Sequence, residues 1–133
     1  HINLSAYHKH SWYLIRHGEL LGYSQSEHLI VAAIARYHRR SYPKKRHEAW
    51  KSLELRRSRR LVSEMSLLLR LSSALDRRPE PVIASIEVNA TPLQVKIKLI
   101  PERMNQDLGL EKWTLRNTIL MAGENIDVDI QVE

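Results

Sequence analysis

Histidine is the residue type with the widest scope for chemistry in this chain, which contains seven of them. His10 and His17 are seven residues apart, a spacing that places them on one face of a predicted helix that also contains His8. From that face they could converge with His38 on a transition metal, because neutral imidazole is a common ligand of such metals. Carboxylates would have to complete a hydrolytic metal site. Helices often carry histidines that are only hydrogen-bonded at the edge of a core, so the spacing alone does not specify a metal.

Other catalytic and binding motifs are missing from the sequence. The absence of cysteine excludes disulfides, thiolate zinc sites and cysteine nucleophiles. The four glycines are scattered, which excludes a P-loop or a dinucleotide-binding fingerprint. No serine belongs to a recognisable motif with a base. We therefore expect no catalytic residue within this chain.

Positive charge is concentrated in one block of the sequence. The net charge is +6, yet residues 36–60 alone net +9, residues 1–35 and 61–80 net zero, and residues 81–133 net −3. Such a block attracts polyanions such as nucleic acid, polyphosphate or an acidic membrane surface, although it can also be no more than a solvated face. The candidate polyphosphate-binding residues are Arg36, His38, Arg39, Arg40, Lys44, Lys45, Arg46, Arg56, Arg57, Arg59 and Arg60.

The elements that must position these residues are predicted to be helical up to about residue 80. Apolar residues recur near helical spacing over 7–20. The segment from Ser24 to Glu27 has the pattern of a capping box and predicts the start of a second helix. A longer helix is predicted from about 53 to 76, and Pro79 marks its end. The basic block would therefore occupy two helix ends and the loop that connects them.

Beyond residue 81 the apolar period changes from helical to alternating. Residues 82–88 and 93–99 alternate apolar and polar side chains, and the segment 89–92 separates them as a turn. This pattern predicts a β-hairpin.

A fifth helix and a third strand complete the predicted fold. The helix is expected from about Asp107, with Leu110 and Trp113 packed on the sheet, and residues 126–132 alternate again as a strand. The fold class is therefore α+β, four helices followed by a ββαβ unit. We expect a helical domain over 1–80 and the ββαβ unit over 81–133.

The length of 133 residues corresponds to one domain or two small packed units. No apolar run approaches the roughly 20 residues of a membrane span, so no membrane partner is expected. The chain opens His1-Ile2-Asn3, without methionine or a leader sequence, so we expect a fragment of a longer protein.

Three segments resemble, in this order, the C-terminal region of the exopolyphosphatase/guanosine pentaphosphate phosphohydrolase (Ppx/GppA) family. They are Tyr7-His8-Lys9-His10-Ser11-Trp12-Tyr13-Leu14-Ile15, Ile34-Ala35-Arg36-Tyr37-His38-Arg39 and Leu69-Arg70-Leu71-Ser72-Ser73-Ala74-Leu75-Asp76-Arg77. With the ββαβ tail, the resemblance covers essentially the whole chain. It implies an HD-like helical domain that follows two actin-like domains, where catalysis occurs, and that helps to bind the polyanionic substrate.

The resemblance also bears on metal binding. The His-Asp doublet of HD phosphohydrolases would precede His1, outside this chain. His10 and His38 match metal-binding positions of metal-bearing relatives, whereas Ser73 stands where the late aspartate is expected, and Asp76 is no evident replacement. The resemblance therefore implies no metal or other cofactor in this chain, with His10 and His38 as weak candidates, and Mg²⁺ for the complete enzyme.

The resemblance implies a substrate-binding or dimerisation domain of a cytoplasmic phosphatase that acts on inorganic polyphosphate or guanosine pentaphosphate (pppGpp). Its partners would be that substrate, the actin-like domains of the same protein and a second copy in a homodimer. Two alternatives stay open. One is a degenerate or self-sufficient HD-type metal-dependent phosphohydrolase, and the other is a basic module that binds nucleic acid.

Overall fold

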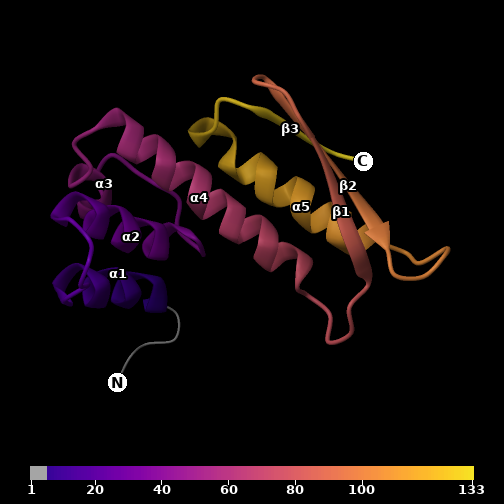
Figure 1. The fold of residues 1–133 in the computed structure, drawn as a ribbon, viewed down its shortest axis with the longest axis horizontal. Coiled ribbons are helices and arrows are strands. Elements are labelled where there is room, and N and C mark those ends of the chain that lie inside the picture. Colours follow the sequence, from indigo (N-terminus) through magenta and orange to yellow (C-terminus); the bar gives the residue numbers. More distant parts are fainter. Residues whose placement is uncertain (1–5) are drawn as a thin grey trace. The chain divides into compact units, whose positions relative to one another are not determined.

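The computed structural model describes residues 6–133, which follow the element order expected from the sequence. Four helices come first, α1 (Tyr7–His17), α2 (Gln25–Tyr37), α3 (Glu48–Lys51) and α4 (Arg56–Leu75). They are followed by β1 (Ile83–Ala90), β2 (Gln94–Pro101), α5 (Gly109–Ala122), a 3-10 turn (Gly123–Asn125) and β3 (Asp129–Val132) (Figure 1). The predicted α+β class, a helical bundle followed by a small ββαβ unit, is confirmed.

The chain divides into two structural units, one that ends at residue 69 and one that spans 70–133, and each is described by itself. No helix within residues 6–133 is both long enough and apolar enough to cross a membrane.

The first unit is built around the apolar face of α2. The capping box that opens this helix is confirmed, since the Glu27 amide donates to Ser24 Oγ over 3.2 Å and the Ser24 amide donates to Glu27 Oε2 over 2.7 Å. Further along α2, Ala33 and Tyr37 are buried. They form a core with Ala49, Leu53 and Val62, against which Trp12, Leu29, Ile30, Ile34 and Trp50 pack.

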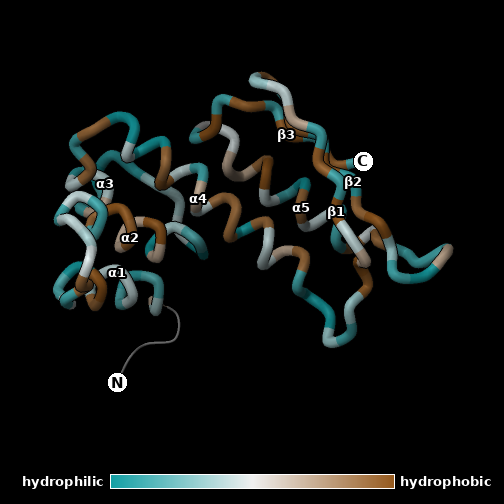
Figure 2. Tube along the Cα trace, in the orientation of Figure 1, coloured by the Kyte–Doolittle hydropathy of each residue, from teal (hydrophilic) through white to brown (hydrophobic). Residues whose placement is uncertain are grey.

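The hydropathy of the chain differs between α2, which supplies this core, and the connection from α2 to α3. Figure 2 shows hydrophobic colours along part of α2 and hydrophilic colours along the connection from α2 to α3. That connection carries the centre of the basic block, including Lys44, Lys45 and Arg46. The buried face of α2 therefore fixes the point from which the basic connection starts.

The second unit contains a three-stranded sheet in the order β1-β2-β3. The strands β1 and β2 are antiparallel, with Ile86 opposite Leu99, and β3 lies parallel to β2. The predicted hairpin is present, but its turn comes later than the segment 89–92, because β1 continues to Ala90. The reversal is closed by Thr91, whose Oγ1 accepts from the Gln94 amide over 3.1 Å.

The prediction that Leu110 and Trp113 pack on the sheet is wrong. Leu110 is 48% exposed and Trp113 is 63% exposed. The helix α5 instead buries a second stripe that includes Glu111, Thr114 and Leu115. Glu111 is fully buried because Arg78 holds its carboxylate at both oxygens, with Nε to Oε1 at 2.6 Å and Nη2 to Oε2 at 3.2 Å. This charge-assisted pair sets the rotation of α5 and leaves the tryptophan outside.

We predict that Glu111, not Trp113, stabilises the second unit. Replacing Glu111 with Ala leaves the half-buried Arg78 guanidinium without its counter-charge and should lower the free energy of unfolding by about 3 kcal/mol. The matched variant Trp113→Ala should cost less than about 1 kcal/mol, because that side chain is exposed. Urea unfolding followed by circular dichroism tests both, and equal losses would contradict the assigned rotation of α5.

Candidate functional site

The first unit holds all eleven candidate polyphosphate-binding residues, in three groups. Residues 6–69 contain thirteen basic and five acidic residues, a net charge of +8. One group ends α2 and fills the turn that follows, the second lies in the connection to α3, and the third opens α4. In this order the groups are Arg36, His38, Arg39 and Arg40, then Lys44, Lys45 and Arg46, then Arg56, Arg57, Arg59 and Arg60.

Tyr37 anchors the first two groups to the core. This side chain is fully buried, and its hydroxyl lies 3.0 Å from Nδ1 of His47. The two rings stack with their centroids 5.7 Å apart, and the Trp50 ring meets Tyr37 edge-on at 6.2 Å. Tyr37 therefore fastens the end of α2 to the start of α3, and the basic connection must bridge these two fixed points.

The Arg36 guanidinium lies 5.8 Å from the Tyr37 ring and takes part in the same network. Burial raises the pKa of Tyr37 to about 12, against the opposing effects of the Arg36 charge and of its hydrogen bond with Arg36. Because arginine can only donate, the Tyr37 oxygen accepts from it, and the hydroxyl proton remains available for Nδ1 of His47. Burial, followed by the charges of Arg36, Arg46, Lys44 and Lys9, lowers the pKa of His47 and favours this neutral acceptor.

His8, on α1, lies in the same positive field. It is only 6% exposed. Burial lowers the pKa of His8, and the charges of Arg36, Lys9, Arg40 and His38 act in the same direction. The sequence analysis did not assign His8, Lys9 or His47 to a site. The four-residue spacing of His8 and Trp12 on one helix face was the signal that could have found His8.

The turn after α2 directs its basic residues toward α1. His38 Nδ1 lies 2.6 Å from the Ala35 carbonyl oxygen and donates to it. Arg40 adopts a left-handed backbone conformation, with φ at 61°, which reverses the chain direction. The Arg39 guanidinium lies 5.6 Å from the Tyr7 ring. The first group of basic residues therefore meets α1, where Lys9 adds another positive charge.

Two arginines near the start of α4 have local partners instead. Arg59 lies 5.7 Å from the Trp50 ring and donates from Nε to the Leu53 carbonyl at 2.7 Å. Arg60 pairs with Glu64, with Nε and Oε1 2.7 Å apart on the surface. Arg56 and Arg57 are exposed. These interactions connect the third group to α3 and to α4 itself.

Nothing among residues 6–133 forms a group of three or more histidine, cysteine, aspartate or glutamate side chains that could hold a metal. His10 is half-buried on α1, and one ring nitrogen of His38, the other weak candidate, is already used by the Ala35 carbonyl. Ser73, at the position of the expected aspartate, is exposed. The absence of a bound metal stays a prediction.

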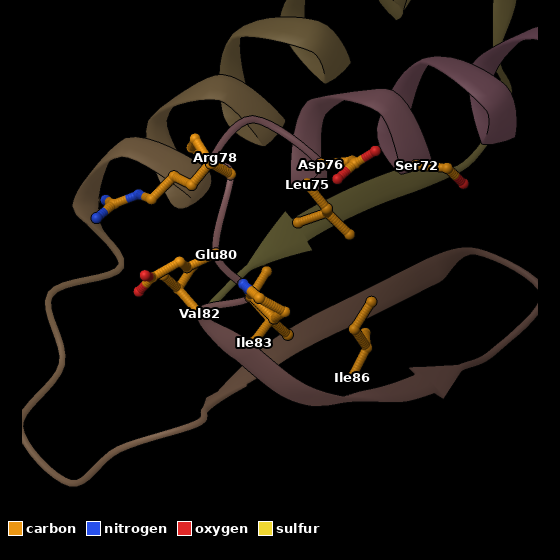
Figure 3. A pocket seen from close by; sticks show the side chains of 10 residues that line it. Ser72, Leu75, Asp76, Arg78, Glu80, Val82, Ile83 and Ile86 are labelled. Carbon is orange, nitrogen blue, oxygen red and sulfur yellow. The ribbon is translucent and has the colours of Figure 1, made fainter.

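Two cavities in the described part of the chain, one in each unit, have linings that can be compared with the basic block. In the second unit a cavity of about 280 Å³ lies between the end of α4 and β1, where Leu75, Ile83 and Ile86 face one another (Figure 3). Arg78, in the same lining, is bound by Glu111. In the first unit a cavity of about 490 Å³ is lined by serines, and Glu54 is the charged residue in its lining. Neither composition suits a polyanion.

The lowered pKa of His8 predicts a pH dependence of stability. Its folded pKa lies below the ordinary value of 6.5, so the unfolded chain takes up the proton first as the pH falls. The contribution of His8 to the free energy of unfolding is therefore fully present above pH 6.5. It is lost as the pH falls from 6.5 through the lowered pKa. In His8→Asn the free energy of unfolding should change less between pH 7.5 and pH 5 than in the unmodified chain.

The matched control for this measurement is His17→Asn, at an exposed position of the same helix. Denaturant unfolding at several pH values gives, for each variant, the slope of the free energy of unfolding against pH. A slope in His8→Asn equal to that of the unmodified chain would contradict the assigned environment of His8.

Two comparisons with known proteins bear on these observations. Residues 1–119 match the family model described as Ppx/GppA phosphatase, domain III. The chain is also similar to guanosine-5'-triphosphate,3'-diphosphate pyrophosphatase of Pseudoalteromonas translucida (strain TAC 125), with 47% identity over 38 residues. That alignment covers 29% of this chain and 8% of the relative. Since the family model matches most of the chain, the chain belongs to the Ppx/GppA phosphatase family, as its domain III.

Proposed function

We propose that this domain binds the polyanionic substrate of a Ppx/GppA phosphatase, inorganic polyphosphate or pppGpp. The observation that carries the proposal is the net charge of +8 over residues 6–69, with basic residues on α1, at the end of α2, in the connection that follows it and at the start of α4. Lys9, Lys44 and Arg46 make no ion pair with another described residue. Lysines supply point charge and guanidinium groups suit bidentate contact with phosphate, so this surface matches a chain of phosphates.

The aromatic residues near the basic block favour polyphosphate over single-stranded nucleic acid. Proteins that bind single strands usually stack bases on exposed aromatic rings. Here Tyr37 is buried, while Tyr7 and Trp50 are half-buried next to Arg39 and Arg59. A linear polyphosphate has no bases to stack and requires only the charged surface. The nucleic-acid module remains the alternative that a competition experiment must address.

The remaining parts of the proposal concern the complete protein. The relative from Pseudoalteromonas is named for a guanosine-5'-triphosphate,3'-diphosphate pyrophosphatase, which supports pppGpp as one substrate of the parent. We place hydrolysis in actin-like domains of the same protein, with Mg²⁺ as their cofactor and the cytoplasm as the location. Among the described residues 6–133, no candidate base lies beside a phosphate-binding loop, so we assign them no catalytic residue.

We predict that the chain binds long polyphosphate without hydrolysing it, with an affinity that falls steeply as salt rises, because binding displaces condensed counterions. The variant Lys44→Ala/Lys45→Ala removes two exposed charges from the connection between α2 and α3. It should weaken binding by about three- to tenfold at 0.1 M salt and reduce the salt slope by about one per lost contact. Titration calorimetry at several salt concentrations measures both quantities, and a phosphate-release assay tests hydrolysis.

A matched pair of lysines controls for net charge. Lys96→Ala/Lys98→Ala removes the same number of exposed charges from β2 and should leave binding nearly unchanged. Equal weakening by both double variants would contradict a binding surface on the first unit. Phosphate release by the pure chain would instead support the metal-dependent hydrolase. Displacement of polyphosphate by DNA at matched salt would favour the nucleic-acid module.

We further propose that domain III mediates homodimerisation through α5. Its exposed apolar residues follow the helical spacing 110, 113 and 120, with Leu120 77% exposed, and continue to Met121. Several large apolar side chains exposed on one helix face typically mark an interaction site, and tryptophan is prominent among residues that dominate interface energy. The partner we favour is the same helix of a second copy, because an isologous contact needs only one such patch.

We predict a concentration-dependent dimer that depends on this stripe. Light scattering after size exclusion should give twice the monomer mass of 15.6 kDa for the unmodified chain. The variant Trp113→Glu/Leu120→Glu should give the monomer mass. Leu93→Glu, at an exposed apolar residue of the hairpin turn, is the control and should remain dimeric. A monomer at all concentrations, or a dimer that persists in the α5 variant, would contradict the proposal.

A further inference from the structure

Two buried polar atoms of the first unit lack a hydrogen-bond partner among the described residues, Nδ1 of His8 and Nε of Arg36. His8 comes from α1 and Arg36 from the last turn of α2, helices that pack against each other. The end of α2 meets this part of α1, since the Arg39 guanidinium lies 5.6 Å from the ring of Tyr7, the residue before His8. Arg36 is also the foremost charge acting on His8. Buried polar groups are hydrogen-bonded in the great majority of proteins, and two such groups without partners require an explanation.

The electrostatic surroundings of these atoms are positive throughout. The charged groups that act on His8 are Arg36 and His38 from α2 and its end, Arg40 from the following turn, and Lys9 from α1. Those that act on His47 are Arg36, Lys9, Arg46 and Lys44. Every one of these groups is basic. Like charges held together raise the free energy of the folded chain until an anion enters among them.

We propose that His8 and Arg36 form the centre of a binding site for one phosphate group, either the terminal phosphate of a polyphosphate or free orthophosphate. This inference rests on the proposed function and adds a defined anchoring point to it. The Nε–H of Arg36 and the Nδ1–H tautomer of His8 would each donate to a phosphate oxygen. A terminal phosphate carries more charge than a phosphate within the chain and has three free oxygens, so it suits a site with several cations best.

The contacts of Arg36 with Tyr37 hold the guanidinium group in a fixed position, which suits a binding site. The guanidinium packs on the buried Tyr37 ring and donates to its hydroxyl, and Tyr37 in turn is joined to His47. Arg36 therefore uses one edge to hold its own position while its Nε remains available. A donor that is fixed before the anion arrives loses little conformational entropy on binding, which strengthens the interaction.

The test is a titration of the chain with orthophosphate at constant ionic strength, followed by nitrogen-15 NMR of the Arg36 Nε–H and the His8 ring. Both signals should shift and saturate together. Arg36→Gln should weaken orthophosphate binding by at least about tenfold, since a charge-assisted hydrogen bond is lost. The matched variant Arg103→Gln, at an exposed position of the second unit, should change it by less than about twofold.

A second pair of variants keeps the test decisive if Arg36→Gln does not fold. Lys9 is exposed on α1 and acts on both histidines, whereas Lys51 is exposed on α3. Lys9→Gln should weaken orthophosphate binding by about threefold, and Lys51→Gln should leave it nearly unchanged. Shifts that do not saturate, or equal effects within the pair, would overturn the site and leave only general attraction of anions.

Two further probes separate the chain end from the free ion. Tripolyphosphate has terminal phosphates, whereas cyclic trimetaphosphate has none. Tighter binding of tripolyphosphate than of orthophosphate at Arg36 assigns the site to a chain end, and the reverse order assigns it to the free ion. Trimetaphosphate binding as tightly as tripolyphosphate, with both tighter than orthophosphate, would overturn the proposal, because trimetaphosphate has no terminal phosphate. If long polyphosphate still binds through Lys44 and Lys45 while orthophosphate does not bind, the proposed function stands and only this inference fails.

Discussion

The burial of Tyr37 is the constraint on which the first unit depends. Its ring fills the core between α2 and α3, and its hydroxyl must find partners there because a buried phenol without one is costly. His47 and Arg36 supply those partners. Since neighbouring residues of a helix point about 100° apart, a buried Tyr37 places Arg36 at the boundary between core and solvent. The position of Arg36, a half-buried cation of the basic block, is therefore fixed by a packing requirement of the core.

Each unit contains a partly buried arginine, and the two arginines differ in whether a carboxylate compensates their charge. Arg78 in the second unit is matched at both carboxylate oxygens by the fully buried Glu111, so its charge is compensated within the fold and sets the rotation of α5. Arg36 in the first unit has a tyrosine hydroxyl, an aromatic face and further cations around it. A compensated pair stabilises structure, whereas an uncompensated cation retains its interaction energy for a ligand. This contrast distinguishes a structural arginine from the one for which we propose a phosphate ligand.

The sequence predicted those features that depend on local patterns. The capping box of Ser24 and Glu27, the change of period after Pro81 and the family all follow from short stretches of chain. The rotation of α5 could not be predicted, because its sequence offers two stripes and the choice rests on Arg78, 33 residues away from Glu111. His8 escaped notice for a related reason. Its surroundings come from other elements, and a search for metal ligands weighs histidine spacing but not nearby cations.

The positive field around His8 and His38 also bears on metal binding. A metal site requires anionic or neutral ligands whose attraction exceeds the loss of the ion's hydration. Here Arg36, Lys9 and Arg40 act on His8 from α1, from the end of α2 and from the turn after it, so a divalent cation beside His8 would enter against their repulsion. Attraction of phosphate and repulsion of metal are thus two effects of one charge distribution. Fixed guanidinium and ammonium groups can hold phosphate without a metal, and such a domain needs neither the missing doublet nor a carboxylate at Ser73 to contribute to substrate binding.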